Sequence, residues 1–414
     1  MDATLFLIKK NVIIFIDRRY IMKFIKELKI DNKKTIIRCD FNVPMKDGKI
    51  VDDTRIIGAL ETINYCLEKN CKIILLSHLG RVKEEKDLEK NNLLPVAKRL
   101  SELLKKPVLF CEKTRGPELD SLVESMKEKD IVLIQNTRYE DLNGKKESEN
   151  DDELAKYWAS LGEVFINDAF GTIHRAHASN VGIAKYLPSA AGFLVEKEIN
   201  ALKILDNPKR PYIVILGGAK VSDKIGVIEN LVNKADKILI GGGMAFTFLK
   251  SKGIEIGKSI LDEENIDFCK SILETNPDKI ILPIDCAVTT EYSEEEPYKV
   301  KDIRDISKDE MGLDIGNKTS QLFKDILKNA GIVVWNGPLG VYEFEKYIKN
   351  TNEILKFLVE NNIKTILGGG DIVAASEKAG YKEKIFHAST GGGATLEYLE
   401  GKKLPGLEAL EINY

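Results

Sequence analysis

The sequence predicts an α/β fold with two doubly wound, parallel-sheet lobes joined by a helix. Short, continuous apolar runs alternate with segments of helical period along most of the 414 residues. Parallel strands that helices cover on both faces have this pattern. The runs are too numerous for one open sheet, and the length favours roughly two to three domains at about 150 residues each. Two Rossmann-like lobes satisfy both observations.

The expected strands are short apolar runs that end in glycine or a polar residue. In the first half they are 35–38, 72–76, 108–110, 131–134 and 164–166. In the second half they are 212–216, 237–240, 280–283, 331–335 and 364–367, with a weaker run at 384–387. A single α/β barrel is the alternative, because about eight βα units can be chosen from these runs. The different chemistry at the strand ends of the two halves argues against a barrel.

A domain boundary is expected near residue 200. Val195, Ile199, Leu202 and Leu205 form one apolar stripe of a helix over 194–206, and the segment 207–211 (Asn-Pro-Lys-Arg-Pro) breaks it. We therefore expect a first domain over 22–193, the linking helix over 194–206 and a second domain over 207–394.

Residues 1–21 are expected to form an extension ahead of the first domain. Lys9, Lys10 and Asn11 split the apolar residues there into two short runs. A signal peptide needs an unbroken apolar run of roughly 7–15 residues, and a membrane span needs about 18. The extension fits neither, and the sequence predicts no membrane partner.

Charge and cysteine content exclude further classes. The net charge is −3, from 62 basic and 65 acidic residues, which argues against a nucleic-acid scaffold. Six cysteines are sparse in this length and form no Cys-x-x-Cys pair, so neither a disulfide framework nor a zinc knuckle is expected. This cysteine usage predicts a cytoplasmic protein.

Basic and polar residues follow the strands of the first half. Ligands bind outside the carboxyl ends of strands in open α/β sheets, and arginine forks bind phosphate oxygens in a bidentate manner. The sequence therefore predicts a site for a small anion. Its candidate residues are Asp40, Asn42, Arg55, His78, Arg81, Arg138, His174, Arg175 and His177.

The strands of the second half end in glycine instead. Glycine lets backbone N–H groups approach a phosphate closely, and a following helix N-terminus adds positive partial charge. Several such turns at one edge favour a nucleotide polyphosphate, with Lys220 and Lys224 as cations and Asp371 as a Mg²⁺ ligand. The turns are 217–220, 241–244, 336–340, 368–371 and 389–393.

The segment 253–259 looks like a P-loop but has three residues between its glycines where the motif needs about four. We interpret it as a surface connection.

From the residues alone, the two edges indicate a phosphotransferase whose lobes close to exclude water. The absence of an obvious catalytic base favours an acceptor that is already ionised, such as a carboxylate.

The sequence closely resembles the bacterial phosphoglycerate kinase family over about residues 22–410. The segments that carry the resemblance are Arg38-Cys39-Asp40-Phe41-Asn42-Val43-Pro44, Asp53-Thr54-Arg55-Ile56, Ser77-His78-Leu79-Gly80-Arg81, Gly171-Thr172-Ile173-His174-Arg175-Ala176-His177, Gly217-Gly218-Ala219-Lys220-Val221-Ser222-Asp223-Lys224, Gly241-Gly242-Gly243-Met244-Ala245, Val334-Trp335-Asn336-Gly337-Pro338, Ser389-Thr390-Gly391-Gly392-Gly393 and Leu404-Pro405-Gly406-Leu407-Glu408-Ala409-Leu410. The resemblance implies reversible phosphoryl transfer between 1,3-bisphosphoglycerate and ADP, giving 3-phosphoglycerate and ATP, with Mg²⁺. It also implies a monomer, and a tail over 395–414 that returns to the first domain.

The resemblance implies roles for individual residues. Asp40 and Asn42 orient the glycerate, and His78, Arg81, Arg138 and Arg175 hold its 3-phosphate, with Leu79 and Gly80 in the same site. Arg55 and Lys220 are the catalytic residues, which stabilise charge on the phosphoryl group in flight. Lys224 and Asn336 contact nucleotide phosphates, Glu343 the ribose and Asp371 the metal. The remaining nucleotide-site residues are Gly218, Ala219, Gly242, Gly312, Pro338, Gly369, Gly370 and Ile372.

Ile372 departs from the family pattern, which usually has Thr or Ser after the aspartate. Either the enzyme lacks one hydroxyl contact to a phosphate, or the isoleucine packs against the preceding strand.

Two alternative functions also stay open. An NAD(P)-dependent dehydrogenase needs a Gly-x-Gly-x-x-Gly turn that no early strand shows. A catalytically inactive binding protein on the same fold would be favoured by loss of Arg55, Lys220 or Asp371, and all three are present.

Overall fold

The computed structural model describes residues 6–9, 12–15 and 22–411. The chain divides into two compact units, which we call unit 1 (Met1–Glu198 with Lys403–Tyr414) and unit 2 (Ile199–Lys402). Of the expected extension over 1–21, only a short antiparallel hairpin of β1 (Phe6–Lys9) and β2 (Val12–Phe15) lies within the described residues.

Unit 1 contains one six-stranded parallel sheet in the order β10-β9-β3-β6-β8-β7. Its strands are buried almost throughout, which explains their continuous apolar character. After β3 the chain builds β6, β7 and β8 on one side of that strand, and then crosses to form β9 and β10 on the other side. A topological switch point therefore lies between β3 and β9. The strands are β3 (Lys34–Cys39), β6 (Lys72–Leu76), β7 (Leu109–Cys111), β8 (Ile131–Ile134), β9 (Val164–Asp168) and β10 (Ser189–Ala191).

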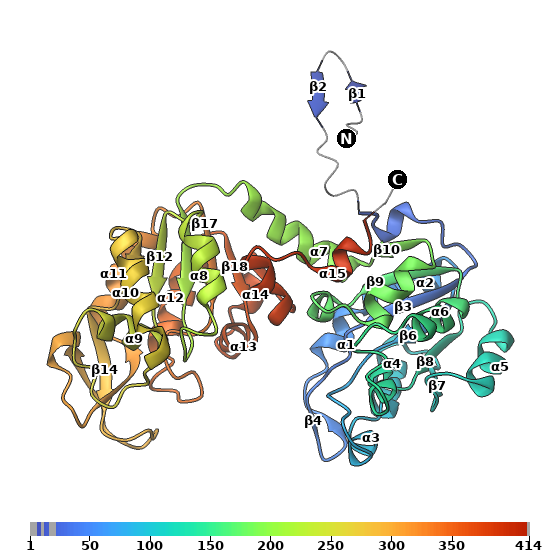
Figure 1. Ribbon diagram of the computed structural model, residues 1–414, viewed down its shortest axis with the longest axis horizontal. Helices are drawn as coiled ribbons and strands as arrows, with labels where there is room; N and C mark the ends of the chain where they lie inside the picture. Colours follow the sequence, from blue (N-terminus) through green and yellow to red (C-terminus); the bar gives the residue numbers. More distant parts are fainter. Residues whose placement is uncertain (1–5, 10–11, 16–21, 412–414) are drawn as a thin grey trace. The chain divides into compact units, whose positions relative to one another are not determined.

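Helices connect the strands of unit 1 (Figure 1). Local signals define several of their starts: Pro117 occupies the first turn of α5, and the Asp151 side chain accepts the Leu154 N–H at 2.8 Å to cap α6. A two-stranded hairpin of β4 (Met45–Lys46) and β5 (Lys49–Ile50) follows β3. The helices are α1 (Thr54–Gly58), α2 (Leu60–Glu68), α3 (Lys86–Lys90), α4 (Leu94–Leu104), α5 (Pro117–Ser125), α6 (Asp152–Ser160) and α15 (Pro405–Glu408), with the 3₁₀ helix η3 (Thr137–Asp141).

Unit 2 contains a second six-stranded parallel sheet, with a different strand order, β13-β12-β11-β17-β18-β19. Numbered along the chain, this is the 3-2-1-4-5-6 order of doubly wound sheets, with the switch point between β11 and β17. Two open sheets exclude the single barrel. The strands are β11 (Tyr212–Leu216), β12 (Lys237–Ile240), β13 (Ile280–Ile281), β17 (Ile332–Asn336), β18 (Thr365–Gly368) and β19 (His387–Ala388).

Unit 2 also carries a three-stranded antiparallel sheet that the sequence analysis did not predict. Its order is β15-β14-β16, with β14 (Asp285–Thr289), β15 (Lys299–Asp302) and β16 (Met311–Ile315). Phe246, Leu249, Cys286 and Val288 form part of a separate apolar cluster beneath it. The helices of unit 2 are α8 (Ile225–Val232), α9 (Met244–Ser251), α10 (Ile266–Thr275), α11 (Asn317–Leu327), α12 (Lys349–Glu360), α13 (Gly370–Lys378) and α14 (Gly393–Leu399).

The boundary between the units falls inside helix α7 (Phe193–Leu202), which continues as a 3₁₀ turn over Lys203–Asp206. The chain enters unit 1 again at Lys403, where the Gly406 N–H donates to the Ile173 carbonyl at 2.8 Å. Helix α14 belongs to unit 2, because the Asn230 side chain donates to the Leu399 carbonyl at 2.6 Å. The chain therefore passes from unit 1 to unit 2 between residues 198 and 199, and returns between residues 402 and 403.

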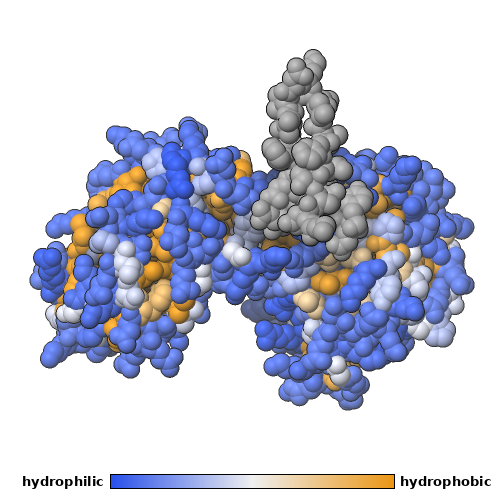
Figure 2. Space-filling view, turned by 45° about the horizontal axis from the view of Figure 1, so that its top comes forward, coloured by the Kyte–Doolittle hydropathy of each residue, from blue (hydrophilic) through white to orange (hydrophobic). Residues whose placement is uncertain are grey.

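Each unit has a mostly hydrophilic surface in the view of Figure 2. This agrees with a charged-residue content of 31%. Among residues 6–9, 12–15 and 22–411, no helix is both long and apolar enough to cross a membrane. All six cysteines lie in the described part of the chain, and all are buried free thiols.

Candidate active site

The carboxyl edge of the sheet in unit 1 brings together most of the predicted anion-binding residues. Asp40 and Asn42 follow β3, and the segment 77–81 follows β6. Arg138 lies on η3 after β8, and the segment 170–177 follows β9. These segments therefore flank the switch point between β3 and β9, where ligands bind in open α/β sheets.

Asp40 and Arg55 form an ion pair at this edge. The guanidinium of Arg55, on α1, donates from Nη1 to Asp40 Oδ2, and the Asn42 N–H donates to Asp40 Oδ1 at 3.3 Å. A Cβ at position 171 would displace Asp40 Oδ2 and so disturb this ion pair, which favours glycine there. Arg55 has five donors, so the pair with Asp40 leaves others for a ligand. Its side chain is 36% exposed, against 6% for Asp40.

Asn136 organises the loops of unit 1, and the sequence analysis did not assign it a role. Its buried side chain accepts the N–H groups of Leu79 at 3.1 Å and Arg138 at 3.0 Å. It also donates to the Leu79 carbonyl at 2.7 Å. The Asn42 side chain accepts the Gly80 N–H at 2.8 Å and adds a second tie to the same loop. The positions of Leu79 and Gly80 thus depend on amide side chains from two other segments.

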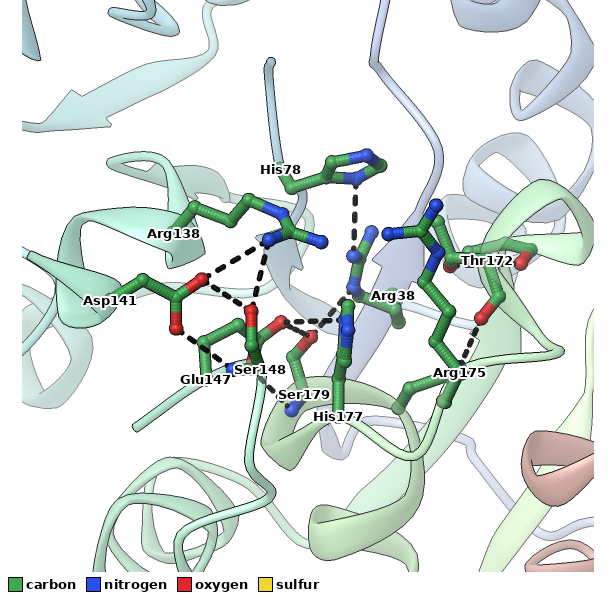
Figure 3. Close-up of polar contacts among 12 residues, drawn as sticks. Arg38, His78, Arg138, Asp141, Glu147, Ser148, Thr172, Arg175, His177 and Ser179 are labelled. Carbon is green, nitrogen blue, oxygen red and sulfur yellow. Dashed lines mark hydrogen bonds and ion pairs between the residues drawn. The ribbon is translucent and has the colours of Figure 1, made fainter. Parts of the chain in front are cut away.

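Arg38 is the second residue that the sequence analysis missed. It is the penultimate residue of β3 and is fully buried. Its Nη2 lies 3.3 Å from His78 Nδ1, and its Nε donates to Ser179 Oγ at 2.8 Å (Figure 3). Burial lowers the pKa of Arg38, while Glu147 and Asp40 oppose the shift. The sequence signal that could have revealed it is an arginine directly after the apolar residues Ile36 and Ile37 within the strand.

The histidines of this edge are neutral at pH 7. Burial lowers the pKa of His78 well below its usual value, and Arg38 and Arg138 lower it further. Burial, with a smaller effect of nearby arginines, also lowers the pKa of His174 to about 4 and of His177 to about 3. The positive charge of the edge therefore comes from arginines, and the imidazoles act as hydrogen-bonding groups.

The arginines of the edge differ in how firmly they are held. Arg138 is buried, and its Nη1 lies 3.2 Å from Asp141 Oδ2 and donates to Ser148 Oγ at 2.9 Å. Half-buried Arg175 contacts His174 Nε2 at 3.2 Å. Arg81 is exposed, and only its backbone carbonyl has a described bond, with the Asn91 side chain. The structure thus clusters Arg38, Arg138 and Arg175 around His78 but leaves Arg81 at the surface.

Glycine-containing loops meet at the switch point of unit 2. The Gly217 N–H donates to the Asn336 carbonyl at 2.8 Å and the Gly218 N–H to the Pro338 carbonyl at 3.0 Å. Gly242 has φ +66°, and a Cβ there would lie 2.7 Å from the Gly218 nitrogen. This close approach of backbone segments requires glycine.

A pocket of about 390 Å³ lies beside these loops. Its apolar wall, which includes Leu313 and Val341, suits the face of a nucleobase. The sequence analysis did not identify this wall or Tyr342, because these residues belong to the unpredicted strand β16 and to an irregular loop. The predicted nucleotide residues that line the pocket are Gly218, Ala219, Gly242, Gly312, Pro338, Glu343 and Asp371.

The remaining predicted residues of unit 2 lie around this pocket or beneath it. Lys220 is exposed, and Lys224 is half-buried, so that burial lowers its pKa while Asp223 and Asp371 oppose the shift. The Asn336 side chain is buried and donates to the Gly368 carbonyl at 2.6 Å. Gly369 and Gly370 lead into α13, with Gly369 at φ +101°.

Ile372 is fully buried in the core of unit 2, in one cluster with Trp335 and Leu367. This placement supports the second interpretation of the isoleucine, that it packs against the sheet. Its backbone N–H remains in the first turn of α13.

The interpretation of 253–259 as a surface connection is wrong in part. Ile256 is 2% exposed and packs in the core, and Ser259 is 7% exposed and accepts the Gly312 N–H at 2.9 Å. Lys258 lines the pocket beside the glycine turns. The segment supports strand β16 from outside the main sheet, an arrangement that no local motif predicts.

Asp371 is the one predicted metal ligand. It is exposed in the first turn of α13, where Tyr342 Oη lies 3.4 Å from Asp371 Oδ1. The described residues contain no group of three or more His, Cys, Asp or Glu side chains that could hold a metal ion by themselves. A single carboxylate beside a nucleotide pocket suits Mg²⁺, which usually binds through one or two carboxylates and the phosphates of its substrate.

A cationic edge in one α/β unit and a glycine-lined pocket in another are the features expected of a phosphotransferase. A family model described as phosphoglycerate kinase matches residues 25–402. The chain belongs to the phosphoglycerate kinase family.

Individual relatives agree with this membership. The phosphoglycerate kinase of Listeria innocua is 56% identical over 390 residues, which cover 94% of this chain and 98% of that protein. That of Lacticaseibacillus casei is 57% identical over 389 residues, or 93% and 98%. The structure is similar to that of phosphoglycerate kinase from Coxiella burnetii, with a TM-score of 0.85 and 39% identity over 94% of this chain and 98% of the other. These findings support the kinase over a dehydrogenase or an inactive binding protein.

Proposed function

We propose that unit 1 holds the glycerate substrate and unit 2 the nucleotide in the reaction of this family. That reaction is reversible phosphoryl transfer between 1,3-bisphosphoglycerate and ADP, giving 3-phosphoglycerate and ATP. The observation that carries the division of labour is the contrast between the two edges. Unit 1 presents arginines and neutral histidines, which suit phosphate and carboxylate groups. Unit 2 presents glycine turns, a pocket and two lysines, which suit a nucleotide.

The transfer needs no general base. In the direction of ATP formation, a β-phosphate oxygen of ADP attacks the phosphorus of the acyl phosphate, and the bond from phosphorus to the carboxyl oxygen breaks. The leaving carboxylate is stable as an anion, so no proton moves. The neutral histidines of unit 1 agree with this chemistry, because they serve as hydrogen-bonding groups for the bound anion. Direct transfer requires the reacting atoms to approach within about 3–3.5 Å.

Arg55 and Lys220 are proposed to stabilise the transferring phosphoryl group. Charge spreads over its three equatorial oxygens in the transition state, and fixed cations are the usual means of stabilising that charge. Asp40 holds one amino group of Arg55 and so limits the positions of the guanidinium. Lys220 is exposed after the glycine turn of β11 and can reach a phosphate bound at that turn.

The remaining predicted residues are proposed to bind and orient the substrates. Asp40 and Asn42 orient the glycerate, and the arginines with His78 hold its 3-phosphate. Backbone N–H groups of the glycine turns, with Lys224, bind the nucleotide phosphates, and Glu343 binds the ribose. We also propose that Asp371 holds Mg²⁺ together with those phosphates. When bound, the ion would neutralise phosphate charge.

Two further properties complete the proposal. The six free thiols agree with a reducing compartment such as the cytoplasm. The net charge of −3 agrees with a protein that does not bind nucleic acid. We propose a monomer, which light scattering of the purified protein checks.

The metal assignment is tested by Asp371→Asn in a coupled assay of ATP formation from 1,3-bisphosphoglycerate. We expect wild-type protein to be active, and the variant to need roughly ten-fold more Mg²⁺ for half-maximal rate, because a charged ligand is lost. Asp267→Asn is the matched control, since Asp267 also lies in the first turn of a helix of unit 2. An unchanged Mg²⁺ requirement in Asp371→Asn would refute the assignment. No ATP formation by wild-type protein would refute the function itself.

A further inference from the structure

A chain of hydrogen bonds leads from a buried carboxylate to His78. Glu147 is fully buried, and its two carboxylate oxygens accept the hydroxyl and the N–H of Ser179, the latter at 2.9 Å. The Ser179 hydroxyl accepts Arg38 Nε at 2.8 Å, and Arg38 Nη2 contacts His78 Nδ1 at 3.3 Å (Figure 3). We call Glu147, Ser179 and Arg38 the arginine relay.

The direction of the last bond is determined by the chemistry of arginine. A guanidinium carries only donors and has no lone pair to offer. His78 Nδ1 must therefore accept from Arg38, which places the proton of the neutral ring on Nε2. The other group close to Nδ1 is Asp40 Oδ1 at 3.9 Å, which is too far for a hydrogen bond. The geometry thus favours the tautomer that donates from Nε2.

The charged surroundings of His78 keep the ring neutral. Burial disfavours a positive charge on the ring, and Arg38, Arg138 and Arg175 disfavour it further. Burial raises the pKa of Glu147, while Arg38 and the two bonds from Ser179 oppose that shift. The charge of buried Arg38 needs a balancing charge, and Glu147, at the far end of the relay, supplies it together with Asp40.

A second relay of similar design lies beside the first, although its carboxylate, Asp141, also contacts Arg138 Nη1 directly at 3.2 Å. The two oxygens of Asp141 accept the N–H and the hydroxyl of Ser148, at 2.8 and 2.5 Å. The Ser148 hydroxyl in turn accepts Arg138 Nη1 at 2.9 Å. Because Glu147 and Ser148 are consecutive, one short segment supports both arginines. The repetition indicates a built arrangement for holding guanidinium groups in place.

We propose that Glu147, Ser179 and Arg38 are positioning residues that hold His78 as the neutral Nε2–H tautomer, so that His78 donates a hydrogen bond to an anionic oxygen of the substrate. This role rests on the proposed binding of the glycerate substrate in unit 1. The tautomer itself can be measured without substrate, so the two proposals fail separately.

The test is nuclear magnetic resonance of the full-length protein with ¹⁵N-labelled histidine near pH 7. The chain has only four histidines, and a His78→Gln variant assigns the His78 signals. We expect wild-type His78 to carry its proton on Nε2. Ser179→Ala should shift His78 toward a mixture of tautomers, because Arg38 loses one of its supports. The KM for 3-phosphoglycerate should rise roughly ten-fold, equivalent to about 1.4 kcal/mol, with the nucleotide KM within about two-fold of wild type.

Two further variants separate positioning from a general structural effect. Ser148→Ala interrupts the second relay, so it should raise the KM for 3-phosphoglycerate but leave the His78 tautomer unchanged. Glu140→Gln removes a buried carboxylate bonded to Thr114 and Arg115, so neither the tautomer nor the KM should change. If Glu147→Gln folds, it should shift the His78 tautomer and raise the KM for 3-phosphoglycerate as Ser179→Ala does. If Glu147→Gln does not fold, the result for Ser179→Ala alone tests the proposal. A proton on Nδ1 of wild-type His78, or an unchanged tautomer in folded Ser179→Ala, would overturn the proposal.

Discussion

The two units share one architecture but present different chemistry at the same place. Each has six parallel strands with a switch point beside its first strand. In unit 1 that edge carries side chains, chiefly arginines and histidines held by Asn136, Glu147 and Asp141. In unit 2 it carries backbone, in glycine turns too close together for a Cβ. The fold therefore determines where ligands bind, and the residues of the turns determine which ligands they are.

The difference extends to how each edge is kept in position. The arginines of unit 1 need buried partners because burying a charge is costly without them. The turns of unit 2 are held by backbone hydrogen bonds between neighbouring loops, such as Gly242 N–H to Leu339 at 2.9 Å. We therefore expect unit 1 to be sensitive to changes of charge and unit 2 to changes of backbone shape.

The largest effect is expected at Arg55 and Lys220, the two residues that we propose stabilise the transferring phosphoryl group. Arg55→Ala in unit 1 and Lys220→Ala in unit 2 should each lower kcat by about two to three orders of magnitude, comparable to the loss of one preorganised oxyanion donor. Steady-state kinetics with both substrates checks this. Arg210→Ala is the control, because Arg210 also pairs with an aspartate, Asp236 at 3.1 Å, but precedes β11, whereas Lys220 follows that strand. A rise in KM with kcat within a few-fold of wild type would assign Arg55 or Lys220 to binding only.

A change of backbone shape should affect the nucleotide alone. Gly242→Ala places a Cβ 2.7 Å from the Gly218 nitrogen and 2.9 Å from the Pro338 oxygen, so the turns must separate. We expect the nucleotide KM to rise roughly ten-fold or more and the KM for 3-phosphoglycerate to stay unchanged. Gly253→Ala is the matched control, since φ is +77° there but no atom lies within 4 Å of the new Cβ. It should cost about 1–2 kcal/mol of stability without altering either KM.

The two units should respond to pH in opposite directions. In unit 1, the pKa of His177 is lowered to about 3 by burial and then Arg138. Between that value and about 6.5 the unfolded chain binds more protons, so stability falls as the pH drops through this window. In unit 2, burial raises the pKa of Asp314 to about 8. There the folded state binds more protons, so stability falls as the pH rises from about 4 to 8. Asp168, with a pKa of about 7 through burial, partly offsets the histidines of unit 1.

Tryptophan fluorescence measures each unit separately, because Trp158 lies in unit 1 and Trp335 in unit 2, both fully buried. Single-tryptophan variants made with Trp→Phe report denaturant midpoints at several pH values. Asp314→Asn should remove the alkaline slope from the Trp335 signal and leave the Trp158 signal as it was. Parallel pH profiles for the two tryptophans would contradict this expectation.

The smallest effect is expected at the N-terminus. A chain that begins at Met22 should keep its activity and melting temperature. The family model begins at residue 25, and a chain that starts at Met22 keeps the β-bridge between Met22 and Glu411. Thermal unfolding and the coupled assay check this. A fall of more than a few degrees would show that residues 1–21 pack on unit 1.

Local pattern predicted the strands well but missed elements that depend on distant partners. Strands β6, β8, β11 and β12 have the predicted bounds, because apolar runs between polar residues are local features. Strand β13 is only Ile280–Ile281, shorter than predicted. The antiparallel sheet of β14, β15 and β16 was missed because charged residues in each of its strands leave no long apolar run, and because its register includes a bulge between Ala287 and Val288.

The sequence by itself determined the fold class, the two contrasting edges and the family, since apolar runs and the residues that follow them are written in order along the chain. Only the tertiary structure decided how those residues are held. Arg38 meets Ser179 across 141 positions of sequence, and Leu79 meets Asn136 across 57. Ile372 could face phosphate or core until the packing of α13 on its sheet placed it in the core. The placement of these side chains depends on which distant segments pack against one another, and the spacing of residues along the chain does not predict that packing.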